Sequence, residues 1–311
     1  MVSSLRGRDL ISLHDLSTEE IWEIIETAAS FKSQRRAGLA ARPLQGKTLA
    51  MIFTKSSTRT RISFEVAMYQ LGGYALFLSG SDLQLKRGET IADTARVLSR
   101  YVDGIMIRTF AHQDVLDLAE SASVPVINGL TDLLHPCQVL ADLLTIYEKR
   151  RRLEGLRLVY VGDGNNMAHS LMFGGAKVGM HVTICCPPAY MPDRGIVAAA
   201  MEDAKATGAK VEVVHDPLAA AAGADVLYTD VWASMGQEVE HAERVKVFQP
   251  YQVNGELLAA AGGDALVLHC LPAHRGEEIT DEVIDGPQSA VFDEAENRLH
   301  AQKAVLALLM S

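Results

Sequence analysis

A turn rich in hydroxyl and guanidinium groups, Ser56 to Arg61, follows the apolar run Leu49–Phe53. Helical spacing of apolar residues continues from Ile62 until Gly72-Gly73 ends it. The start of a helix offers unpaired N–H groups and a positive dipole end, and an arginine such as Arg59 can bind two phosphate oxygens at once. Ser57 or Thr58 could instead only cap the helix while the arginines are solvated. The crowding of hydroxyls and arginines favours a site for phosphate or a phosphorylated small molecule.

Two further residues of the first half could bind an anion or a carbonyl group. Arg108 ends the predicted strand Gly104–Arg108, where open α/β sheets bind ligands. His135 precedes Pro136 at the start of a predicted helix that runs to about Lys149. The sequence leaves open whether His135 is structural or donates a hydrogen bond to a ligand at a second helix N-terminus.

The second half contains a turn that resembles a dinucleotide fingerprint, Gly162-Asp163-Gly164. The third glycine is replaced by Met167, and cysteines, Cys185-Cys186, stand where an acidic residue is expected. We therefore disfavour an NAD-dependent oxidoreductase. Asn165 and Asn166 in the same turn could cap a helix or hold the backbone groups of an amino acid.

Two more strand ends carry reactive side chains. Asp230 ends a predicted strand and could cap a helix or bind a substrate ammonium group. Cys270 lies in the sequence His269-Cys270-Leu271-Pro272 at the end of another predicted strand. A buried cysteine is commonly inert packing, yet the position before a proline turn also suits a site residue.

Alternating strand and helix patterns predict an α/β fold with two doubly wound parallel-sheet domains. The basic run Lys149–Arg152 marks the boundary between domains 1–150 and 151–311, and the last helix, about 295–311, could return to the first domain. The predicted strands are 49–53, 74–78, 104–108 and 124–128 in the first domain, and 156–161, 181–185, 210–214, 224–229, 265–268 and 289–292 in the second.

Composition excludes several classes of function. The 311 residues carry a formal net charge of −10, which argues against nonspecific binding to nucleic acid or anionic membranes. No apolar run approaches the roughly 20 residues of a membrane span, and no targeting leader is visible. The four cysteines form no CxxC pair, so we expect neither a metal site nor a disulfide framework, and a cytoplasmic setting.

Taken together, four motifs resemble those of the transcarbamylase family, and the resemblance runs the length of the chain. They are Ser57-Thr58-Arg59-Thr60-Arg61, His135-Pro136-Cys137-Gln138, Asp230-Val231-Trp232-Ala233-Ser234-Met235-Gly236 and His269-Cys270-Leu271-Pro272. The family implies an N-terminal carbamoyl-phosphate domain, a C-terminal amino-acid domain, a cleft between them, and a trimer or an assembly of trimers.

The resemblance also implies roles for individual residues. Those expected to be catalytic are Arg59, Arg108, His135, Asp230 and Cys270. Those expected to bind carbamoyl phosphate are Ser57, Thr58, Arg59, Thr60, Gln84, Arg108, His135, Gln138, Cys270, Leu271 and Arg298, with Gln84 entering from a neighbouring subunit. Those expected to bind ornithine are Asn166, Asp230, Ser234 and Met235.

The implied reaction is carbamoyl transfer to the δ-amine of L-ornithine, giving citrulline and phosphate in arginine biosynthesis. Carbamoyl phosphate already carries a good leaving group, so we expect no metal and no other cofactor. Gln84, in place of the lysine of aspartate enzymes, argues against aspartate as the acceptor, and Asp230 with Ser234-Met235-Gly236 resembles a cradle for α-amino and α-carboxylate groups that a putrescine enzyme would not need. The resemblance therefore favours L-ornithine, with aspartate, putrescine or N-acetylornithine as the alternative acceptors. A catalytically silent relative would be expected to lack reactive residues such as Arg59, His135 and Cys270, which are all present.

Overall fold

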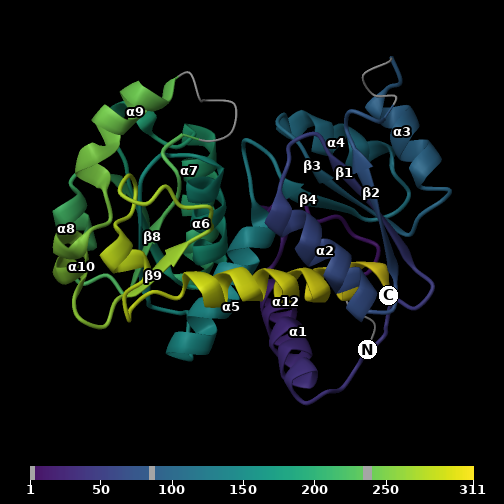
Figure 1. The fold of residues 1–311 in the computed structure, drawn as a ribbon, viewed down its shortest axis with the longest axis horizontal. Coiled ribbons are helices and arrows are strands. Elements are labelled where there is room, and N and C mark those ends of the chain that lie inside the picture. The colour runs from purple at the N-terminus through teal and green to yellow at the C-terminus, as the bar shows by residue number, and fades with distance from the viewer. Residues whose placement is uncertain (1–3, 84–87, 234–239) are drawn as a thin grey trace. The chain divides into compact units, whose positions relative to one another are not determined.

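The computed structural model describes residues 4–83, 88–233 and 240–311. The chain forms two compact units, one of residues 1–144 and 296–311 and the other of residues 145–295 (Figure 1). Each unit is built on its own parallel sheet. Across the described ranges, none of the helices has an apolar stretch long enough to cross a bilayer.

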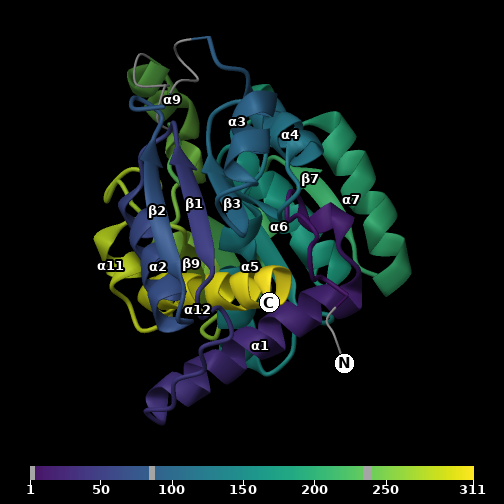
Figure 2. The same ribbon diagram turned by 90° about the vertical axis from the view of Figure 1, so that its right-hand side faces the viewer.

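The first unit is built on a sheet of four parallel strands in the order β2-β1-β3-β4. Figure 2 shows β2, β1 and β3 side by side in that order. Ser17 and Glu20 form a capping box at the start of α1. The elements are η1 (Leu13–Asp15), α1 (Thr18–Arg36), β1 (Thr48–Phe53), α2 (Thr58–Gln70), β2 (Tyr74–Ser79), α3 (Ile91–Leu98), β3 (Gly104–Arg108), α4 (His112–Ser121), β4 (Val126–Leu130) and α5 (Pro136–Arg150), with most of the last helix, α12 (Val291–Met310).

Apolar side chains fix the middle of this sheet. β3 and β4 are buried along their whole length, as expected for strands covered on both faces. One part of the core joins the two central strands to α3 and α4, through Ala50, Ile52, Ala95, Ile105, Ile107, Val115 and Leu118. The edge strand β2 differs, because its tyrosine, Tyr74, and its neighbours Leu76 and Phe77 are exposed.

The second unit is built on five parallel strands in the order β7-β6-β5-β8-β9. Its core gathers side chains from β5, β8 and β9 around Trp232 and Phe248, whose rings stack 6.0 Å apart. The elements are β5 (Arg157–Val161), α6 (Asn166–Lys177), β6 (His181–Cys185), η3 (Pro188–Tyr190), α7 (Arg194–Thr207), β7 (Val211–Val214), α8 (Pro217–Ala221), β8 (Val226–Thr229), α9 (His241–Phe248), η5 (Gln249–Tyr251), α10 (Gly255–Ala261), β9 (Leu266–His269) and α11 (Asp281–Ile284).

The strand order reverses once in each sheet, between β1 and β3 in the first and between β5 and β8 in the second. Helices on either side of such a point leave a crevice at the carboxyl ends of the strands, where open α/β sheets bind ligands. The turn after β1 and Arg108 lie at the first reversal, and Asn165 and Asp230 lie at the second. The fold therefore brings the candidate residues to the two places where binding is expected.

The predicted strand 289–292 was wrong. Only Ser289 forms a bridge, to Val267, and α12 already begins at Val291. The apolar residues Ala290 and Val291 are buried, and a short buried apolar run of this kind is compatible with either a strand or the start of a helix. The last helix consequently begins earlier than the predicted 295.

A polar cluster joins α1 to α12 within the first unit. Lys32 Nζ donates a 2.7 Å hydrogen bond to Asn297 Oδ1, and His300 Nε2 lies 3.6 Å from Glu296 Oε1. Desolvation lowers the pKa of His300 to about 4, and the charges of Lys32 and Lys303 add to this while Glu296 opposes it. His300 is therefore neutral in the folded protein at pH values where an unfolded histidine is charged.

Folding stability should consequently fall as pH drops below about 6.5, because the unfolded chain then binds a proton that His300 in the folded chain does not. At pH 5 this effect should cost about 2 kcal/mol relative to pH 7. The substitution His300→Asn should remove that part of the pH dependence. Urea unfolding of both proteins at pH 7 and pH 5 measures it, and an equal loss in the two proteins would contradict the assignment.

Candidate active site

The turn after β1 forms a helix start that has no acidic side chain in its first turn. Ser57 is the N-cap of α2, and its hydroxyl accepts a hydrogen bond from the Thr60 N–H at 3.2 Å. Thr58 is exposed, Arg59 is half-buried and Thr60 is buried. Ser57 therefore does cap the helix, and the first turn of α2 contributes no carboxylate of its own to neutralise the positive end of the helix.

Two arginines from distant parts of the chain meet at the Thr60 hydroxyl. Arg298 Nη2 donates to Thr60 Oγ1 at 3.2 Å, and Arg108 Nη1 lies 3.5 Å from the same oxygen. Arg298 Nη1 also donates to Gln138 Oε1 at 2.5 Å, and Gln138 Nε2 donates to Asp142 Oδ1 at 2.8 Å. All four residues of this chain, Thr60, Arg108, Gln138 and Arg298, are buried.

His135 lies in the field of these cations. Desolvation lowers the pKa of His135 well below its usual value, and Arg298, Arg108, Lys55 and Arg59 lower it further. The imidazole is therefore neutral at pH 7 and can donate a single N–H to a ligand. The four positive side chains around buried His135 repel one another, and a bound anion would stabilise this arrangement by offsetting their charges.

Lys55 was missed by the sequence reasoning. Its side chain is buried, its Nζ lies 3.0 Å from Asp132 Oδ1, and it also contacts the Phe110 ring at 4.9 Å. Asp132 is mostly exposed, so solvent screens its charge. The positive charge of Lys55 still contributes to lowering the pKa of His135. The position of Lys55, two residues after β1 and just before the hydroxyl-rich turn, was the available signal.

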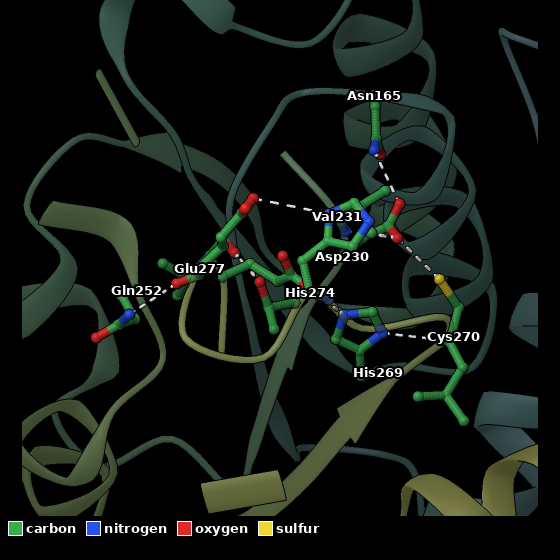
Figure 3. Close-up of polar contacts among 12 residues, drawn as sticks. Asn165, Asp230, Val231, Gln252, His269, Cys270, His274 and Glu277 are labelled. Carbon is green, nitrogen blue, oxygen red and sulfur yellow. Dashed lines mark hydrogen bonds and ion pairs between the residues drawn. The ribbon is translucent and has the colours of Figure 1, made fainter. Parts of the chain in front are cut away.

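In the second unit, three donors converge on the Asp230 carboxylate (Figure 3). Cys270 Sγ and the Val231 N–H donate to Oδ1 at 3.0 and 2.8 Å, and Asn165 Nδ2 donates to Oδ2 at 3.0 Å. Asp230 is buried, and Cys270 is half-buried at the end of β9. The structure thus brings together Asp230 and Cys270, two of the residues that the resemblance implied to be catalytic.

The contact from Asn165 was not assigned in advance. Its Oδ1 caps α6 by accepting from the Met167 and Ala168 N–H groups, which leaves its Nδ2 to reach Asp230. Asn166, the residue assigned from the resemblance, is the first residue of α6 and is buried. Asn165 therefore lies beside the end of β8, and Asn166 follows it as the first residue of α6.

His269 is not positioned to act as a base for Cys270. Its Nδ1 accepts from the Leu271 N–H at 2.9 Å, and its Nε2 lies 3.0 Å from Glu278 Oε1. The His269 and Glu278 side chains are fully buried, so this pair holds the backbone of Leu271. Asp230, His269 and Cys270 come close enough to hold a metal ion, but both ring nitrogens of His269 are already engaged.

A buried arginine holds the start of α9 to this site. The guanidinium of Arg244 contacts the Asp163 carboxylate and the Trp232 carbonyl, and it lies over the Tyr190 ring at 4.6 Å. Burial raises the pKa of Asp163 to about 6, against the opposing effect of Arg244. Gln84, Ser234 and Met235, which the resemblance assigned to the site, lie outside the described residues.

These observations define a protein of two α/β units, each built on a parallel sheet. One unit has a set of cationic side chains suited to bind an anion, and the other has a carboxylate paired with a thiol. Residues 8–148 match the family model of the aspartate/ornithine carbamoyltransferase carbamoyl-P binding domain, and residues 154–309 match that of the Asp/Orn binding domain. The chain therefore belongs to the aspartate/ornithine carbamoyltransferase family.

Individual relatives are similar over their full length. The chain is 62% identical to the ornithine carbamoyltransferase of Pyrococcus horikoshii, covering 100% of this chain and 98% of the relative. It is 61% identical to that of Carboxydothermus hydrogenoformans, covering 100% of both. The solved ornithine carbamoyltransferase of Pyrococcus furiosus superimposes with a TM-score of 0.97 at 61% identity, covering 100% of this chain and 99% of that one.

Proposed function

We propose that this chain transfers the carbamoyl group of carbamoyl phosphate to the δ-amine of L-ornithine, giving L-citrulline and phosphate. The observation that carries the proposal is the convergence of Arg108 and Arg298 on Thr60 beside a neutral His135. Full-length relatives named as ornithine carbamoyltransferases support ornithine as the acceptor. The Pyrococcus furiosus relative named anabolic supports the biosynthetic direction.

We assign the two substrates to different parts of the chain. Residues 1–150, with Cys270, Leu271 and Arg298 from the rest of the chain, bind carbamoyl phosphate, and other residues of 151–311 bind ornithine. The carbamoyl-phosphate residues are Ser57, Thr58, Arg59, Thr60, Gln84, Arg108, His135, Gln138, Cys270, Leu271 and Arg298. The ornithine residues are Asn166, Asp230, Ser234 and Met235.

The proposed chemistry is direct attack of the neutral δ-amine on the carbonyl carbon. The C–N bond forms as negative charge develops on the carbonyl oxygen. Phosphate then leaves with the electrons of the C–O bond and takes up the proton that the attacking nitrogen loses. Arg59, Arg108 and the His135 N–H stabilise the developing charge, an effect worth roughly 3–4 kcal/mol per donor. Phosphate is already a good leaving group, so the step requires no metal and no other cofactor.

The acceptor amine must lose a proton, because a lysine-like amine has a reference pKa of about 10.4. The Asp230 carboxylate already accepts from Cys270 and Asn165, which orients it and the thiol together. We propose that this pair binds the δ-amine and positions its neutral form. Cys270 does not form a carbamoylated intermediate, because His269 is committed to Leu271 and Glu278.

Citrulline formation tests the proposed activity. Purified protein is incubated with carbamoyl phosphate and, in separate reactions, with ornithine, aspartate, putrescine or N-acetylornithine, and the carbamoylated product is quantified. We expect ornithine to be used with a kcat/KM far above that of the other three amines. Activity confined to another acceptor would overturn the substrate assignment.

The substitution Cys270→Ala should lower kcat/KM for ornithine by about tenfold to a hundredfold, because Asp230 loses one of its three donors and the amine loses an orienting contact. Binding of carbamoyl phosphate should persist, as isothermal titration calorimetry would measure. Mass spectrometry of the wild-type protein during turnover provides a separate check. A kinetically competent carbamoyl group on Cys270 would contradict direct attack.

We propose a homotrimer, or an assembly of trimers, in the cytoplasm. The support is the edge strand β2, which exposes Tyr74 and Leu76 on one face and Phe77 on the other, because an exposed apolar edge strand commonly marks a protein interface. Sedimentation equilibrium should give three times the chain mass, or a multiple of it. Replacing Tyr74 and Phe77 with glutamate should yield smaller species, and a monomeric wild-type protein would exclude the trimer.

A further inference from the structure

Two histidines and a glutamate form a second cluster in the second unit, separate from Asp230 and Cys270. His241 is the first residue of α9, and His274 and Glu277 lie in the segment between β9 and α11. His241 Nε2 lies 3.0 Å from Glu277 Oε2, and His274 Nδ1 lies 3.7 Å from the same oxygen. One ligand atom from each of the three side chains lies within 4.8 Å of the other two.

These spacings fit the coordination of a transition metal. Zinc–nitrogen and zinc–oxygen bonds of about 2.0–2.1 Å in a tetrahedron separate neighbouring ligand atoms by roughly 3.3 Å. The separations of 3.0 and 3.7 Å lie on either side of that value, so small rotations of the side chains bring the atoms to it. Two imidazoles and a carboxylate also form a ligand set that binds zinc with one position open to water.

Backbone contacts fix two of the three ligands. Gln252 Nε2 donates to the Glu277 and Gly276 carbonyls at 2.8 and 2.9 Å, and the His274 N–H donates to Glu278 Oε1 at 2.6 Å. Arg275, between His274 and Gly276, binds Asp281 and Asp285 at 2.7 and 2.5 Å. His274 and Glu277 are therefore held before a metal arrives, which lowers the entropic cost of binding it.

We propose that His241, His274 and Glu277 bind a divalent transition metal ion of the zinc class. All three side chains are partly exposed to solvent, so the ion has a path of entry. The bound ion joins the start of α9 to the segment after β9. It thereby links the regions that follow Asp230 and Cys270 along the chain, without using either residue as a ligand.

Cobalt(II) titration of untagged Cys270→Ala protein tests the site, because this variant lacks the thiol of the neighbouring Asp230–Cys270 cluster. We expect one ion per chain, visible d–d absorption, and no thiolate charge-transfer band. In the same background, His274→Ala and Glu277→Gln should each weaken binding by at least about tenfold. His14→Ala, which removes an exposed histidine of the first unit, should leave binding unchanged.

Amide hydrogen exchange, measured with and without zinc, tests whether the ion joins α9 to the segment after β9 or binds elsewhere. Protection should rise in α9 and in residues 271–280, and not in the first unit. The proposal is overturned if Glu277→Gln and His274→Ala bind cobalt as tightly as the His14→Ala control, or if zinc leaves exchange in α9 unchanged. These readouts do not depend on turnover, so failure of the proposed enzymatic function would leave them interpretable.

Discussion

Replacing Arg108 with methionine should lower kcat/KM for carbamoyl phosphate by about a thousandfold or more. The change removes a donor that is aimed at the Thr60 region and that contributes to the field at His135. Losing one preorganised donor to a developing oxyanion costs roughly 10² to 10³ in kcat, and weaker binding of the phosphate adds to this. Steady-state kinetics with saturating ornithine measure the loss.

The same substitution should make the unliganded protein more stable by about 1 kcal/mol, because the remaining cations near His135 repel one another less. Carbamoyl phosphate should then stabilise the variant much less than it stabilises the wild type. Arg96→Met is the matched control, since Arg96 is exposed and pairs with Asp93 on α3. Equal activity of the Arg108 and Arg96 variants would contradict the anion-site assignment.

Replacing Asp230 with asparagine should lower kcat/KM for ornithine by at least about a hundredfold, the equivalent of about 2.7 kcal/mol. The new side chain would turn an amide N–H group toward donors from Cys270, Val231 or Asn165, and it would leave only one oxygen to accept a hydrogen bond from the δ-amine. The dissociation constant for carbamoyl phosphate should change by less than about threefold, since the carbamoyl-phosphate residues of the first unit are untouched.

Asp225→Asn provides the control for a purely structural effect. Asp225 precedes β8 at its opposite end, and its Oδ2 accepts a hydrogen bond from the Arg157 N–H at 2.7 Å. Both substitutions should destabilise folding, by about 1–3 kcal/mol each. Only the Asp230 variant should lose ornithine selectively, and a similar loss in the Asp225 variant would assign the effect to folding.

The general fold could be predicted from the sequence because each strand is a short apolar run followed by a helical pattern. β3 and β4 are buried along their whole length, so neither strand shows the alternation of apolar and polar residues that would have indicated an antiparallel sheet. The prediction was wrong at residues 289–292, where a short buried run meets a helix start. Local spacing alone does not distinguish a strand from a buried helix turn.

The candidate site could be predicted only where its residues lie at recognisable strand ends. Arg108 and Asp230 follow strands, and the resemblance supplied Arg298, which lies on the last helix. That Arg298 and Arg108 share the Thr60 hydroxyl depends on packing across most of the chain length, which no local pattern encodes. Likewise, the hydrogen bond from Asn165 to Asp230 depends on how the turn before α6 packs against the end of β8, 65 residues further along the chain.

Binding of a conjugate that joins a phosphonoacetyl group to the δ-nitrogen of L-ornithine tests the central claim most directly. Such a compound presents the groups of both substrates at once, and phosphate cannot leave from it because a methylene group stands in place of the oxygen between the carbonyl carbon and phosphorus. Calorimetry should show tighter binding than for carbamoyl phosphate or ornithine alone, with an affinity loss of at least about a hundredfold in each of the Arg108→Met and Asp230→Asn variants. Equally tight binding of the corresponding aspartate conjugate, or full affinity in either variant, would contradict the assignment of the two substrates to these residues.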